Sequence, residues 1–145
     1  MTTYPVLRAV AIDATDARQV AEFWRELLGF TYRKGDEAPP AGAPDPQGHD
    51  WLVLRDAAGE ARLAVQQVDE LPPSTWPSAD VPQQLHLDLD VTTFAELEVQ
   101  RDRALALGAT ILMDRSTDPE EPLYVFSDPA GHPFCIFVSP VPPAG

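Results

Sequence analysis

The chain has little cysteine, little lysine and no long apolar run, and each shortage excludes a class of protein. Cys135 is the single cysteine, so one chain can form neither an internal disulfide nor a metal cluster built from several cysteines. No apolar stretch approaches the roughly 20 residues that a membrane helix requires. The segment Met1-Thr-Thr-Tyr-Pro5 lacks the basic and apolar regions of a secretory signal, so we expect a cytoplasmic protein.

Basic residues are scarce as well. Ten lysines and arginines stand against 23 aspartates and glutamates, Lys34 is the only lysine, and the formal net charge is −13. A surface this acidic repels phosphate backbones and anionic lipids, which argues against nucleic acid and membranes as partners. The length of 145 residues suits one compact domain, and a hydrophobic fraction of 44% is typical of a globular protein.

The chain does contain an internal repeat. Arg8-Ala-Val-Ala-Ile-Asp-Ala-Thr15 matches Leu85-His-Leu-Asp-Leu-Asp-Val-Thr92 at an offset of 77 (85 − 8). Val53-Leu-Arg-Asp-Ala-Ala-Gly59 matches Val125-Phe-Ser-Asp-Pro-Ala-Gly131 at an offset of 72 (125 − 53). Repeated units that cannot bury their own apolar face pack on each other, so we expect a pocket where the two copies meet.

Each copy predicts one strand, one helix and three further strands. In the first copy, apolar residues at three- and four-residue spacing predict a helix that begins after Asp16 and ends at Gly29. Alternation and turn signals predict the strands. The predicted strands of the first copy are 6–14, 30–33, 51–55 and 62–68.

The second copy predicts the same order after a proline-rich connection. Its predicted elements are strands over 84–91, 109–113, 123–126 and 133–138, with a helix over 93–107. We therefore expect a single domain, 1–145, made of module one (6–70), a linker (71–82) and module two (83–139).

Four pieces of the sequence, in this order, resemble the vicinal oxygen chelate superfamily, the group of glyoxalases, bleomycin-resistance proteins and extradiol dioxygenases. They are Ala21-Glu-Phe-Trp24 with Leu27-Leu-Gly-Phe30, Gln84-Leu-His-Leu-Asp-Leu89, Leu107-Gly-Ala109 and Asp128-Pro-Ala-Gly131. More specifically, the chain is similar to glyoxalase-like proteins. The resemblance implies an α+β fold in which two βαβββ modules form a curved mixed sheet around a cavity, and it implies a homodimer.

The resemblance also implies where a metal would bind. In that superfamily, four residues on the first and last strands of the two units hold a divalent ion. Carried over to this chain, they are Ala9, His86 and Cys135, with Leu63 or, after a one-residue bulge, Ala64 as the fourth. Alanine and leucine cannot coordinate, and a catalytic divalent site normally has three protein ligands. We therefore expect no cofactor and no catalytic metal.

If a metal is nevertheless bound, the expected ligands are His86 with Cys135 or Gln66. Gln66 is the first polar residue on the strand face of Ala64. Asp88 and Asp90 share the strand face of His86, which leaves a shifted metal site open.

His86 is the centre of the predicted site. It stands between Leu85 and Leu87, whose side chains must face the helix, so the imidazole points to the opposite face of the strand. A packed core histidine is the alternative, but an imidazole that titrates near neutral pH is more useful in a cleft. We therefore predict that His86 is an acid or base and that Asp88, one pleat along, orients its ring.

Other residues are candidates for the wall of the pocket. Cys135, flanked by Phe134 and Ile136, fits a small buried apolar residue. Trp76 lies in the proline-rich linker and would either cap the cavity or pack at a subunit interface. The predicted ligand-binding set is Gln66, His86, Asp88, Cys135, Trp51, Trp76 and Phe137.

Two functions remain open from the sequence. The first is metal-independent binding of a small organic molecule in the cavity between the modules, as in antibiotic or metabolite binding and resistance. The second is an isomerase or lyase in which His86 moves a proton and Asp88 orients the ring. A metal-dependent glyoxalase or dioxygenase is disfavoured by the missing ligands.

Overall fold

The structure, a computed structural model, describes residues 3–139 and divides into two compact units at the Leu71–Pro72 bond. Unit one contains β1 (Val10–Ala14), α1 (Ala17–Leu28), β2 (Thr31–Tyr32), the 3-10 helix η1 (Gln47–His49), β3 (Trp51–Arg55) and β4 (Ala61–Gln67). Unit two contains β5 (Leu87–Val91), α2 (Phe94–Leu107), β6 (Thr110–Arg115), β7 (Leu123–Ser127) and β8 (Pro133–Val138). Both units follow the predicted order.

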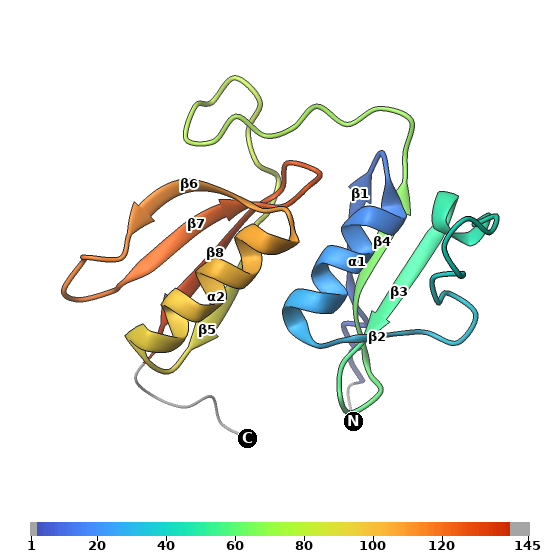
Figure 1. Ribbon diagram of the computed structural model, residues 1–145, viewed down its shortest axis with the longest axis horizontal. Coiled ribbons are helices and arrows are strands. Elements are labelled where there is room, and N and C mark those ends of the chain that lie inside the picture. Colours follow the sequence, from blue (N-terminus) through green and yellow to red (C-terminus); the bar gives the residue numbers. More distant parts are fainter. Residues whose placement is uncertain (1–2, 140–145) are drawn as a thin grey trace. The chain divides into compact units, whose positions relative to one another are not determined.

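Each unit builds its own mixed four-stranded sheet, and its helix lies across one face of that sheet (Figure 1). The strand order is β1-β4-β3-β2 in unit one and β5-β8-β7-β6 in unit two. The first and last strands of each unit pair in parallel, and the other neighbours pair antiparallel. The shared topology confirms the internal repeat and the two-module α+β fold.

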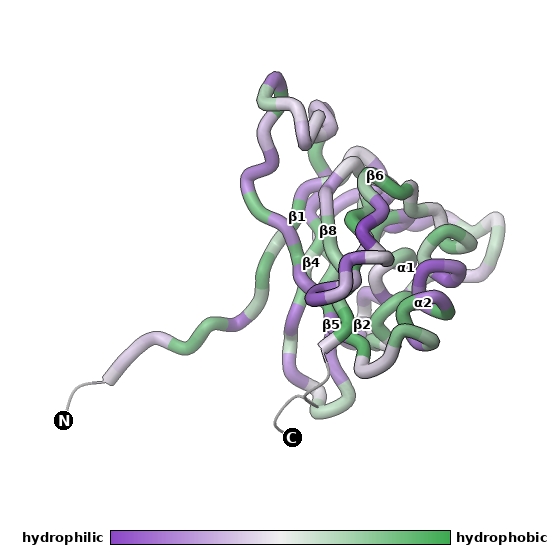
Figure 2. Tube along the Cα trace, turned by 90° about the vertical axis from the view of Figure 1, so that its left-hand side faces the viewer, coloured by the Kyte–Doolittle hydropathy of each residue, from purple (hydrophilic) through white to green (hydrophobic). Residues whose placement is uncertain are grey.

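Apolar side chains on the helix-facing side of each sheet form the core. In unit one, Leu52, Leu54 and Val65 are fully buried beneath α1. The tube in Figure 2 shows both hydrophobic and hydrophilic stretches along the strands, and in β5 leucine alternates with aspartate, so that the two kinds of side chain lie on opposite faces of the sheet. Trp24 of α1 is 1% exposed and belongs to this core.

The helix of unit one begins and ends where the sequence predicts. The Asp16 carboxylate accepts a hydrogen bond from the amide of Gln19 at 3.1 Å, which satisfies one of the free N–H groups of the first turn. Gly29 ends the helix with φ 68°, a left-handed conformation that glycine adopts without a steric penalty.

Three strands are shorter than predicted, and one of them is β2, which covers Thr31–Tyr32 rather than 30–33. β1 begins at Val10 rather than at residue 6, and β5 begins at Leu87 rather than at residue 84. Leu87 pairs with Phe134, and the residue before Phe134 is Pro133, which has no N–H to extend the ladder. His86 therefore immediately precedes β5 instead of lying within it.

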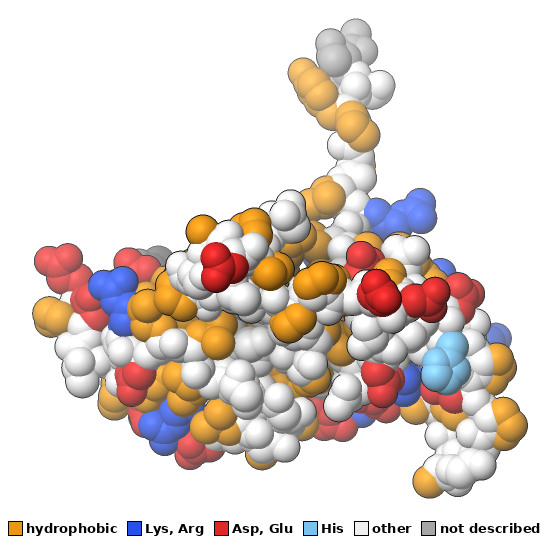
Figure 3. Space-filling model, turned by 90° about the horizontal axis from the view of Figure 1, so that it is seen from above, with side chains coloured by type: hydrophobic (Ala, Val, Ile, Leu, Met, Phe, Trp, Pro, Cys, Tyr) orange, Lys and Arg blue, Asp and Glu red, His pale blue; other side chains and the backbone are white. Residues whose placement is uncertain are grey.

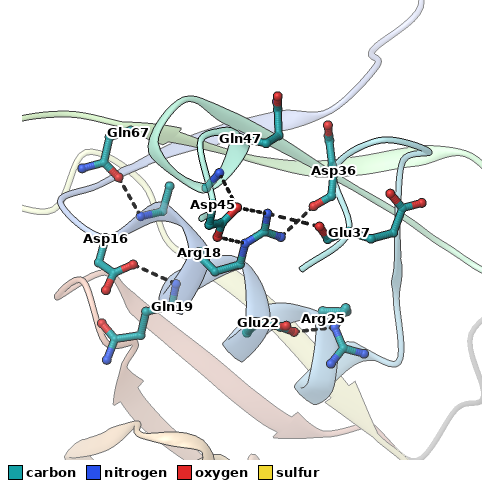
Figure 4. A network of polar contacts seen from close by, with 12 residues as sticks. Asp16, Arg18, Gln19, Glu22, Arg25, Asp36, Glu37, Asp45, Gln47 and Gln67 are labelled. Carbon is teal, nitrogen blue, oxygen red and sulfur yellow. Dashed lines mark hydrogen bonds and ion pairs between the residues drawn. The ribbon is translucent and has the colours of Figure 1, made fainter. Parts of the chain in front are cut away.

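Arg18 ties the proline-rich loop of unit one to α1 (Figure 4). Its guanidinium pairs with Asp45, with an Nε–Oδ2 distance of 2.8 Å, and donates to the carbonyl of Asp36 at 2.6 Å. The Asp36 side chain is itself buried and accepts the amide hydrogen of Val53 at 2.9 Å. Polar contacts rather than regular structure thus hold this loop.

The same turn closes the last hairpin of both units. Asp56 and Asp128 each accept two backbone N–H groups of their own turn, at 2.9 to 3.0 Å. This local bonding explains why the Asp-x-Ala-Gly pattern occurs twice.

The last hairpin of unit one carries one strand residue more than the last hairpin of unit two. The β3–β4 register shifts so that Arg62 is skipped, whereas β7 and β8 stay in register throughout. Beyond the bulge, Ala64 pairs with Val53 as Cys135 pairs with Val125. The residue of unit one that corresponds to Cys135 is therefore Ala64, as a one-residue bulge predicts, and not Leu63.

None of the helices within residues 3–139 combines the length and the apolar character needed to cross a membrane. On the face drawn in Figure 3, acidic side chains are scattered among apolar and basic ones rather than gathered in one patch.

Candidate functional site

Three polar side chains of unit two meet where β5 and β8 run side by side. The Nε2 atom of His86 lies 3.3 Å from Oδ1 of Asp88, and Asp88 is the cross-strand partner of Cys135. One ligand atom from each of the three residues lies within 4.8 Å of the others. Strand alternation puts His86 beside Asp88, and the parallel register adds Cys135.

An apolar surface surrounds this polar cluster. Leu123, Val125 and Cys135 are buried together, and Trp76 and Phe137 pack against them. Cys135 alternates along β8 with Phe134 and Ile136, so it belongs to the sheet face opposite α2. Phe137, two residues further along β8, lies on the same face as Cys135.

Trp76 belongs to the segment that precedes the second sheet and lies over its free face. Pro73, in the same segment, lies so close to Gly131 that a Cβ on that glycine would meet the proline Cβ at 2.4 Å. Gly131 also has φ 93°, so the close approach of Pro73 and the backbone conformation both favour glycine at this position. The predicted linker 71–82 therefore contacts unit two through Pro73 and Trp76.

Trp76 and His86 border a small recess of about 70 Å³. Its lining residues are Trp76, Gln83, His86, Val125, Pro133 and Cys135. Pockets for drug-sized ligands have volumes of roughly 300 to 1,000 Å³, so the recess holds one end group of a ligand rather than a whole molecule.

The Cys135 thiol is protonated at neutral pH. Burial raises its pKa to about 11, and the negative charge of Asp88 and a hydrogen bond to it act in the same direction. A reactive cysteine has a lowered pKa, so this environment opposes a nucleophilic role.

The donor set of unit two is suited to a metal in number and in chemistry. His86, Asp88 and Cys135 offer a nitrogen, an oxygen and a sulfur, a combination that zinc accepts, and three protein ligands are the usual number at a catalytic site. Metal binding would require the Cys135 thiol to lose its proton, and this cost opposes binding. In unit one, the equivalent positions Ala9 and Ala64 supply no donor.

The remaining predicted residues lie in unit one. Trp51 and Gln66 face each other across the β3–β4 ladder, where Gln66 is exposed and Trp51 is partly buried. The structure thus gathers five of the seven predicted residues in unit two and places the other two together in unit one. Three further lining residues were not predicted, namely Gln83, Val125 and Pro133. Strand alternation from Cys135 would have indicated Pro133, and no pattern indicates Gln83.

A family model described as the glyoxalase-like domain matches residues 9–137. No curated protein matches the chain. Solved structures do match over nearly its whole length.

Two of these structures are close in fold and distant in sequence. A glyoxalase/bleomycin resistance protein/dioxygenase family enzyme from Burkholderia phytofirmans has 18% identity and a TM-score of 0.64, with 90% of this chain and 96% of that chain covered. A glyoxalase/dioxygenase from Nostoc punctiforme has 17% identity and a TM-score of 0.65, with 97% and 100% covered.

A third similar structure is the fosfomycin resistance protein FosX from Listeria monocytogenes. It was solved as a complex with Mn(II) and 1S,2S-dihydroxypropylphosphonic acid, at 15% identity, a TM-score of 0.64 and coverage of 95% of this chain and 94% of that chain. At these identities the likeness shows the fold alone.

Proposed function

Since the chain belongs to the glyoxalase-like domain family, we propose that it binds a small organic molecule on the free face of the second sheet, without a catalytic metal. The proposal is carried by the recess beside Trp76 and Cys135, where an apolar surface meets the His86–Asp88 pair. An apolar hollow with a few converging polar groups is the usual character of a small-molecule site. The fold shared with a fosfomycin resistance protein makes an antibiotic or a related metabolite the favoured ligand class.

Each residue of the site has a distinct part in binding. Trp76 covers the ligand with an apolar ring face, and Cys135 and Val125 form the floor. Because Asp88 engages Nε2 of His86, the Nδ1 atom is the one left to hydrogen-bond the ligand. The protonated thiol of Cys135 adds a weak donor.

A screen by NMR tests this proposal. Small neutral carbonyl and hydroxyl compounds are added to the full chain, and the imidazole signals of the three histidines are followed. We expect at least one compound to shift the His86 signal saturably, and we expect Trp76→Ala to weaken its binding about tenfold or more, which corresponds to about 1.4 kcal/mol.

His49→Ala is the matched control, since His49 is exposed and lies in unit one. It should leave the affinity unchanged. Compounds that bind equally well after Trp76→Ala and His86→Ala would place the ligand elsewhere and contradict the proposal.

A second candidate is an acid–base enzyme, favoured by the 3.3 Å separation of His86 Nε2 and Asp88 Oδ1. A carboxylate at this distance orients the imidazole, so that Nδ1 would exchange a proton with a carbon or hydroxyl of the substrate. For a ligand found in the screen, exchange of C–H for deuterium in D₂O would reveal this activity. Asp88→Asn should then slow exchange more than it weakens binding. Tight binding with no exchange and no product would exclude the enzyme for that ligand.

The metal-free part of the proposal has its own test. After treatment with chelator, the melting temperature should stay within about a degree when zinc, manganese or nickel is added, because an ion at a hundredfold excess over its Kd would stabilise by about 2.7 kcal/mol. If the melting temperature rose by several degrees and His86→Ala abolished the rise, His86, Asp88 and Cys135 would hold a metal. In that case the ion would supply Lewis-acid chemistry at this face.

A further inference from the structure

Unit one contains a second, larger hollow, whose lining is rich in arginine. It has a volume of about 740 Å³ and lies on the sheet face opposite α1. Four arginines line it, namely Arg8, Arg33, Arg55 and Arg62, and Glu60 is the one carboxylate among the lining residues within 3–139. In a chain with a formal net charge of −13, this concentration of positive charge is exceptional.

Two of these arginines are already neutralised by carboxylates. Arg33 pairs with Asp36 at 3.1 Å, and Arg62 pairs with Asp56 at 2.6 Å. For Arg8 and Arg55, no carboxylate of residues 3–139 lies within ion-pair distance. The hollow therefore keeps an excess of positive charge that the described part of the protein does not balance.

Arg55 carries the second observation. Its Nε atom is buried and has no hydrogen-bond partner among the described residues. A buried donor without an acceptor is rare because its lost hydration is not replaced. A planar guanidinium presents its N–H groups as a fork that matches the oxygens of a carboxylate or phosphate, so the part of the Arg55 guanidinium that lines the hollow is suited to bind an oxyanion.

The floor of the hollow is apolar. Val53 and Ala64 lie at its base, and Trp51 of β3 borders it. On the other side, the extended segment before β1 contributes Val6 and Leu7, which are largely exposed; in Figure 2 this segment runs away from the strand it leads into. An occupant would thus combine an anionic group with an apolar body.

We propose that unit one binds an organic oxyanion, a carboxylate, phosphate or phosphonate attached to an apolar group, through Arg55 and Arg8. The apolar group lies over Val53, Ala64 and Trp51. This site goes beyond the function proposed above, because it uses residues of unit one and none of the His86 cluster.

Phenylphosphonate is a suitable probe, since it joins a divalent oxyanion to an aromatic ring. Binding to the full chain is followed at low salt by calorimetry and by the indole N–H signal of Trp51, assigned with Trp51→Phe. We expect saturable binding that shifts this signal. Benzyl alcohol, which has the ring without the charge, should bind at least tenfold more weakly. Inorganic phosphate, which has the charge without the ring, should also bind more weakly.

Substitutions locate the anion. Arg55→Gln should weaken phenylphosphonate binding about tenfold or more, as expected for a lost hydrogen bond to a charged group, and Arg55→Lys should restore only part of it. Arg8→Gln, in an extended segment, should weaken it without any effect on folding. Arg115→Gln in unit two removes the same charge outside the hollow and should change the affinity less than twofold.

Three results would overturn the proposal. The first is the absence of a saturable shift of the Trp51 indole N–H signal. The second is an equal loss of phenylphosphonate affinity in Arg55→Gln and Arg115→Gln. The third is unchanged affinity when both Arg8 and Arg55 are replaced. All reporters lie in unit one, so these outcomes are independent of the tests on His86 and Trp76.

Discussion

The two units of this protein share one topology and differ in the chemistry of their free sheet faces. Unit two has His86 and Cys135 where unit one has Ala9 and Ala64, while unit one has a hollow lined by four arginines. The helix-facing side of each sheet, by contrast, keeps its apolar pattern. The comparison indicates that the buried face preserves a repeated fold and that the free face is where the two copies have diverged.

The helices show a second contrast. α1 has six buried residues, whereas α2 has two, Leu97 and Ala104. Phe94, Val99 and Leu105 of α2 are all substantially exposed. Unit one should therefore depend more on its helix than unit two does.

Matched leucine substitutions give the sharpest test of this contrast. Leu27 of α1 is 7% exposed and Leu105 of α2 is 41% exposed. Leu27→Ala should lower the free energy of unfolding by about 2 to 4 kcal/mol because it leaves a cavity, and Leu105→Ala by less than about 1 kcal/mol. Urea unfolding of both variants measures the difference. Equal losses would mean that α2 is packed as tightly as α1.

The Arg18 network comes next in expected effect. Arg18→Met removes the partner of Asp45 and a donor to the carbonyl of Asp36, which should cost about 1 to 3 kcal/mol at pH 7. Arg18 lowers the pKa of Asp45, so this stability is present above the unfolded pKa of about 3.9 and is lost as pH falls through the folded value. The difference in the free energy of unfolding between wild type and Arg18→Met should therefore become smaller below about pH 4.

Arg115→Met provides the comparison for this measurement. Arg115 pairs with Asp118 at an exposed position, where a salt bridge contributes little. If Arg115→Met lowered the free energy of unfolding as much as Arg18→Met does, Arg18 would stabilise the proline-rich loop of unit one no more than an exposed ion pair does.

Thiol labelling tests whether Asp88 helps to raise the pKa of the Cys135 thiol. Because the pKa of Cys135 is raised to about 11, labelling should be slow at pH 7.5 and accelerate as pH rises. The stability linked to this group is present below its unfolded pKa of about 8.5 and is lost as pH rises towards 11. Asp88→Asn should lower the pKa and speed labelling several-fold, while Asp90→Asn should not. Rapid, pH-independent labelling near pH 7 would show a thiolate and refute the assignment.

A small change in stability is expected at His86. Its side chain is 42% exposed, so His86→Ala should lower the free energy of unfolding by less than roughly 1.5 kcal/mol at a pH above 7. Urea unfolding decides this, with His49→Ala as the exposed counterpart in unit one. A loss of 2 to 4 kcal/mol would identify His86 as a packed core group instead.

Local patterns were sufficient to predict most of the fold. The caps at Asp16 and Gly29, the two Asp-x-Ala-Gly turns and the neighbouring positions of His86 and Asp88 all depend on residues close together in the chain. Interactions between distant residues could not be read in this way. No sequence pattern shows Arg18 reaching Asp45, or Asp88 lying opposite Cys135, because both contacts follow from how loops and strands come together.

The bulge at Arg62 bears on how a repeated protein can tolerate insertions. A residue added inside a regular strand would reverse the facing of every position after it and turn Leu63 and Val65 out of the core. Here the extra residue is left unpaired, so the inward and outward alternation resumes at once. A lengthened hairpin can thus be inherited without loss of the core. An alignment of the two halves at the constant offset of 72 would nevertheless pair Cys135 with Leu63 instead of Ala64.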